Sequence, residues 1–213
     1  GDSCAVPAPC SRLHLQRCLA GGGAGGGGGV LALLELLYAA LRAEGVTEEI
    51  LEEASSQLHG LLTAAPTVLA PPLHGSLNWL QELALTRAAA YEATQARLCA
   101  VMALTCRSLP LAQVESSLAA LVPLVPLPSA ACVGIVEQRK AIGAMLAIGL
   151  IGSYQLEAHD AGGAAGGMEA LLRDATLKMA ALLAHDQTGV AAAAASAVGS
   201  LGSLAPLPLP DGD

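Results

Sequence analysis

The sequence predicts an all-α protein, and three observations support this prediction. Leu and Ala, which are both strong helix formers, dominate an apolar fraction of 54%. Apolar residues recur with helical spacing, as in the run from Val30 to Glu44. No segment has the strict alternation of apolar and polar residues that is typical of a half-buried strand. A chain of 213 residues is long enough to bury a core, as one large domain or two small ones.

The first predicted element is a hairpin of two helices. Its first helix covers residues 30–44 and ends at Gly45, a residue suited to the left-handed conformation that follows many helices. Thr47 then caps a second helix, which has acidic residues in its first turn and stops before Pro66. Two helices joined by so short a turn pack antiparallel.

A long helical signal follows the prolines near residue 70. It starts after Ser76, a good N-cap, and continues to Arg107. Because some 31 residues is long for a globular helix, we expect a break within residues 86–93. A short helix over residues 111–122 then ends at three closely spaced prolines, which each remove a backbone donor.

The last third of the chain predicts three more helices. Ser129 caps a helix that runs to about Tyr154. Glycines in residues 157–167 predict a surface loop. The helices that follow cover residues 168–185 and 189–204 and pack as a pair.

One small-residue pattern appears three times, each time on a predicted helix. Its copies start at Arg97, Arg139 and Ala191, which lie 42 and 52 residues apart. A period of about 40–47 residues is typical of stacked helical hairpins. At offsets of two, three, six and seven, the three copies carry Cys99, Ala100, Ala103 and Leu104; Ala141, Ile142, Met145 and Leu146; and Ala193, Ala194, Ala197 and Val198.

Residues 168–204 resemble one HEAT-type repeat of the armadillo-type fold. The first helix ends in Leu182–Asp186, Gln187–Gly189 form the turn, and Val190 leads the alanines of the second helix. The resemblance implies a short α-solenoid of degenerate, antiparallel hairpins, in which the alanines let paired helices approach closely. Many such repeats carry a basic residue where this copy has Ala191, so an inter-repeat Asp–Arg ladder is incomplete. The alternative is an irregular helical bundle whose Ala and Leu richness imitates repeats.

These elements predict three regions. Residues 1–29 form a Gly-rich, flexible segment, residues 30–205 a helical-repeat domain, and residues 206–213 a disordered tail. Because the sequence begins with Gly rather than Met, we interpret it as a fragment of a larger scaffold or as a processed chain.

Charge and hydropathy exclude several classes of partner. The formal net charge is −8 and the ten basic residues are scattered, so the chain lacks the basic stripe of a nucleic-acid binder. The apolar run at residues 141–153 falls well short of the roughly 20 residues that span a bilayer, so we expect no stable membrane insertion. An acidic chain with free thiols suggests the cytoplasm.

Cysteine and histidine positions raise one metal hypothesis. Cys10, His14 and Cys18 have the spacing of one helix face and could hold a metal ion. No paired Cys-x-x-Cys accompanies them, so we predict no metal and no cofactor and leave this set open. Cys99 and Cys106, seven residues apart on one helix face, are interpreted as small core residues.

The sequence contains no catalytic grouping, because its histidines fall near helix ends or in loops. We therefore predict a non-enzymatic scaffold or adaptor that binds other proteins through its second helices, with partner identity and oligomeric state left open. The alternative is a helical-bundle enzyme or ligand-binding protein with a pocket between hairpins. Trp79 is interpreted as hairpin packing or as an interface anchor, and the acidic residues as a solvated helix start or a dock for a basic partner. The candidate partner surface comprises Trp79, Arg97, Arg139, Lys140, Glu48, Glu49 and Glu52.

Overall fold

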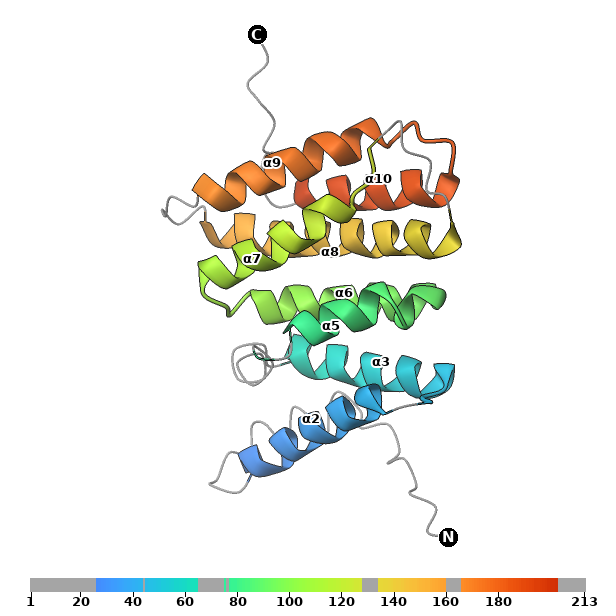
Figure 1. Cartoon of the computed structure of the whole chain (residues 1–213). Coiled ribbons are helices and arrows are strands. Elements are labelled where there is room, and N and C mark those ends of the chain that lie inside the picture. The colour runs from blue at the N-terminus through green and yellow to red at the C-terminus, as the bar shows by residue number, and fades with distance from the viewer. Residues whose placement is uncertain are drawn as a thin grey trace.

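A computed structural model of the chain describes residues 26–43, 45–64, 75, 77–127, 134–159 and 166–202 (Figure 1). Every regular element in these ranges is helical, which confirms the all-α prediction. The 3₁₀ helices η2 (Ala88–Ala90) and η3 (Val122–Leu124) accompany the α-helices in the described ranges. The α-helices are α2 (Gly26–Arg42), α3 (Glu48–Ala64), α5 (Leu77–Leu85), α6 (Glu92–Cys106), α7 (Leu111–Leu121), α8 (Ile135–His159), α9 (Gly166–Ala181) and α10 (Thr188–Gly202).

The second helices of successive pairs form one layer. Helix α3 packs on α6, α6 on α8, and α8 on α10. In Figure 1 these helices are stacked in that order, with α5 and α7 lying in front of α6 and α8. Apolar side chains from all of these helices form one continuous core. The small-residue pattern thus lies on α6, α8 and α10, which are consecutive neighbours in space.

Two positions of the small-residue pattern explain how α6, α8 and α10 pack together. The residues at offsets of two and six are buried in every copy: Cys99, Ala103, Ala141, Met145, Ala193 and Ala197. Most are small, so the helix axes can approach closely there.

The closest approach in this layer is between α8 and α10. A Cβ atom built on Gly149 would lie 2.7 Å from the Cα atom of Ala197, and one on Gly152 would lie 2.4 Å from a methyl of Leu201. Residue numbers rise together along the two helices, so α8 and α10 run parallel. At Gly149 a side chain would meet the backbone of α10, which cannot yield locally, whereas at Gly152 it would meet the ends of the Leu201 and Leu172 side chains.

The N-terminal hairpin has the predicted turn. Gly45 has a φ of +73°, the left-handed conformation that glycine adopts without strain. The carbonyl of Thr47 accepts the first helical hydrogen bond of α3 from the N–H of Leu51, at 3.1 Å. Helix α2, however, begins at Gly26, so the prediction of a start at Val30 was wrong. The apolar run after Gly29 propagates the helix cooperatively back through four glycines.

The predicted break in the long helical segment is confirmed. Helix α5 ends at Leu85, Thr86 and Arg87 form a turn, and η2 follows before α6 starts at Glu92. Tyr91, between the two, is extended, with a ψ of 100°. The break folds α5 back against α6, which makes this segment a hairpin.

The boundaries of the last hairpin differ from the prediction. Helix α8 continues to His159 and α9 starts at Gly166, so the predicted loop over residues 157–167 is shorter at both ends. Helix α9 ends at Ala181, where tighter bonds such as Leu182 N–H to the Met179 carbonyl (3.0 Å) replace helical ones. Thr188 and Gly189 belong to α10 rather than to the turn.

Several predictions fall on residues outside the described ranges. These are the caps Ser76 and Ser129, the set Cys10, His14 and Cys18, the tail over residues 206–213, and the first 25 residues of the predicted flexible segment over residues 1–29. None of the described helices is both long and apolar enough to cross a membrane.

Candidate interaction surface

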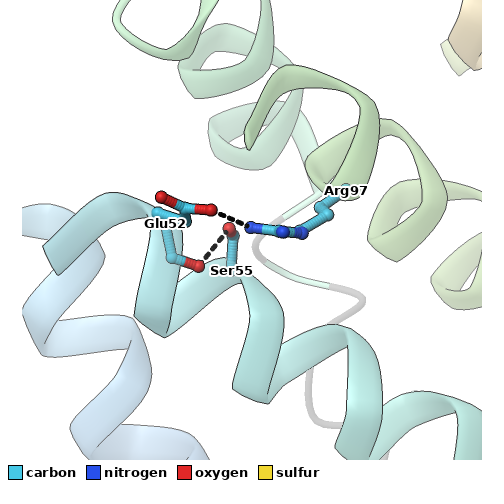
Figure 2. Close-up of polar contacts among 3 residues, drawn as sticks. All are labelled: Glu52, Ser55 and Arg97. Atoms are coloured by element: carbon cyan, nitrogen blue, oxygen red, sulfur yellow. Dashed lines mark hydrogen bonds and ion pairs between the residues drawn. The ribbon is translucent and has the colours of Figure 1, made fainter. Parts of the chain in front are cut away.

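Arg97 joins the second helices of the first two hairpins. Its Nη1 atom lies 3.1 Å from Oε1 of Glu52, across the α3–α6 contact (Figure 2). The Ser55 hydroxyl, beside this pair, donates to the Glu52 carbonyl at 2.9 Å. The side chains of Arg97 and Glu52 keep 33% and 53% of their surface exposed, so water screens the pair and its contribution to stability is small.

Arg139, at the equivalent position of the next copy, is bound differently. Its Nη1 atom donates to the carbonyl of Ala89 at 2.9 Å and to that of Ala90. Both carbonyls belong to η2, so this guanidinium fixes the start of α8 against the α5–α6 turn. Lys140, the next residue, is half-buried. Arg97 and Arg139 therefore hold hairpins together, and the third copy has Ala191 in their place.

A buried glutamine, which the sequence analysis missed, strengthens the joint between α6 and α8. The Nε2 atom of Gln95 donates to the carbonyls of Ala84 and Arg139, both at 3.0 Å. Gln155 repeats the arrangement at the other end, donating to the carbonyl of Cys106 at 3.0 Å. A buried polar side chain costs free energy unless it is paired, so both amides fix the position of α8.

The acidic residues at the start of α3 fit their interpretation as the solvated first turn of a helix. Glu48 and Glu49 are exposed in its first turn. A backbone hydrogen bond and one from the Thr47 side chain lower the pKa of Glu49. Negative charge here also complements the partial positive charge of the helix N-terminus. The position of Glu48 and Glu49 at the start of α3 therefore explains these two acidic residues, and the explanation does not require a partner protein.

Trp79 packs between the first two hairpins. Its ring centroid lies 5.8 Å from that of Tyr38 on α2, with the planes tilted by 53°. The guanidinium carbon of Arg42 lies 4.9 Å from the centre of the Trp79 ring. The side chain is half-buried against the core. This geometry matches the hairpin-packing interpretation, and part of the ring stays open to solvent.

The histidines and cysteines discussed next lie in the core or at contacts between helices and turns. His59 lies beside α6, and burial together with the charge of Arg97 lowers its pKa. The backbone N–H of Gln187 donates to Nδ1 of His185 at 3.1 Å, within the α9–α10 turn. Cys99 and Cys106 are fully buried, which confirms their interpretation as core residues, and this burial raises the pKa of both thiols to about 12. Among the residues that the structure describes, no three His, Cys, Asp or Glu side chains come together as a metal site.

One surface of the second-helix layer remains uncovered by the first helices. Exposed or half-exposed residues recur there at helical spacing on α3, α6 and α8. The N-terminal part is charged and the part on α8 is apolar. We call this surface the open face: Glu52, His59, Ala96, Arg97, Ala100, Leu146 and Leu150.

Comparison of the chain with protein-family models, with curated proteins and with solved structures finds no match. The HEAT-type resemblance therefore depends on the sequence pattern of this chain alone and stays a prediction.

Proposed function

We propose that the chain is a non-enzymatic scaffold of HEAT-like helical hairpins that binds other proteins through the open face. The proposal includes a cytoplasmic location, because Cys99 and Cys106 are free thiols in an acidic chain.

The observation that carries the proposal is the narrow range of sequence separations between bonded residues of different hairpins. Hydrogen bonds that join different hairpins connect residues 44 to 53 positions apart, starting with Arg87 Nη2 to the Ala43 carbonyl at 3.0 Å. The bonds from Gln95 to Arg139, from Cys99 to Gly143 and from Gln155 to Cys106 have separations of 44, 44 and 49. A stack of similar hairpins favours such a narrow range, whereas an irregular bundle mixes short and long separations.

A stack of this kind suits protein binding better than catalysis. Each second helix adds a row of side chains to one extended surface, and such surfaces bind other proteins in repeat architectures. The open face offers charged residues on α3 and α6 next to Leu146 and Leu150 on α8. A polar rim beside an apolar strip is a usual composition for a protein interface.

The test compares two matched variants. Ala96 is exposed on the open face and Ala112 is exposed on α7, on the opposite side of the layer. Wild type, Ala96→Arg and Ala112→Arg are each immobilised, and the proteins they retain from a cell extract are quantified by mass spectrometry. We expect specific partners that Ala112→Arg keeps and Ala96→Arg loses, while both variants melt at the wild-type temperature. Equal retention by the two variants would refute binding through the open face.

A further inference from the structure

We draw no further inference here: the strongest candidate, the surface patch of exposed apolar side chains around η3 and the start of α8 (Leu124, Leu127, Ile135 and Val136), carries no proposal because nothing in the described part of the chain shows what covers it.

Discussion

Replacing Gly149 by alanine tests the contact on which the stacking of α8 and α10 depends. Alanine is the better helix former by about 1 kcal/mol, so the substitution would stabilise a free helix surface. At Gly149 the new Cβ would lie 2.7 Å from the Cα atom of Ala197 and 3.0 Å from its Cβ and carbonyl oxygen. Backbone cannot yield as a flexible side chain does, so α10 must shift as a unit. Overpacking of this kind costs about 1–3 kcal/mol.

The net expectation for Gly149→Ala is a loss of up to about 2 kcal/mol of unfolding free energy, after the gain in helix propensity is subtracted. For a chain of this size the melting temperature falls by up to about 8 °C. Gly60→Ala is the matched control, because Gly60 is helical with nothing within 4 Å of a Cβ. That variant should melt about 2–4 °C above wild type.

The assay is urea and thermal unfolding followed by far-ultraviolet circular dichroism. Ala197→Leu, on the other side of the same contact, should also lose about 1–3 kcal/mol. If Gly149→Ala were as stabilising as Gly60→Ala, the close approach of α8 and α10 would be refuted.

Three further predictions concern buried polar and titratable groups. Gln95→Ala should destabilise the fold by about 1–3 kcal/mol, measured by urea unfolding, because two buried carbonyls lose a donor. Cys99 and Cys106, with pKa values raised to about 12, should resist alkylation at pH 8.5 until the chain unfolds, as peptide mass spectrometry can check. The free energy of unfolding should fall as the pH rises from about 9 to 12, because only the thiols of the unfolded chain ionise in that range, and unfolding curves check this. Burial and the charge of Arg97 lower the pKa of His59, so the stability that its neutral form contributes above pH 6.5 is lost as the pH falls. The stability of His59→Gln should therefore be less sensitive to acid than that of wild type, and NMR should show His59 titrating below pH 6.5.

Local signals predicted much of the fold. The excess length of the helical signal over residues 77–107 predicted the break at Thr86 and Arg87, and Gly45 predicted the left-handed turn. The small-residue pattern marked four offsets on α6, α8 and α10, and the residues at two of them, offsets two and six, are buried in every copy. Each of these depends on helix length, backbone conformation or periodicity, which the sequence carries locally.

Features that depend on neighbours in space could not be predicted. Gln95 looks like any helical glutamine, and only the approach of α5 and α8 gives its amide one carbonyl partner on each of these helices. Arg97 and Arg139 were predicted to belong to a partner surface, and the sequence did not show that each also bonds to a neighbouring hairpin within the chain. The start of α2 at Gly26 was missed because glycine is a poor helix former by itself.

The contact between Gly149 and Ala197 can be observed directly by NMR of a chain labelled at alanine methyl groups. If α8 and α10 pack in parallel as described, the Ala197 methyl will show a strong NOE to the α protons of Gly149, since a Cβ built at Gly149 lies 3.0 Å from the Cβ of Ala197. An Ala197 methyl with cross-peaks to water and none to α8 would contradict the stacking of the hairpins.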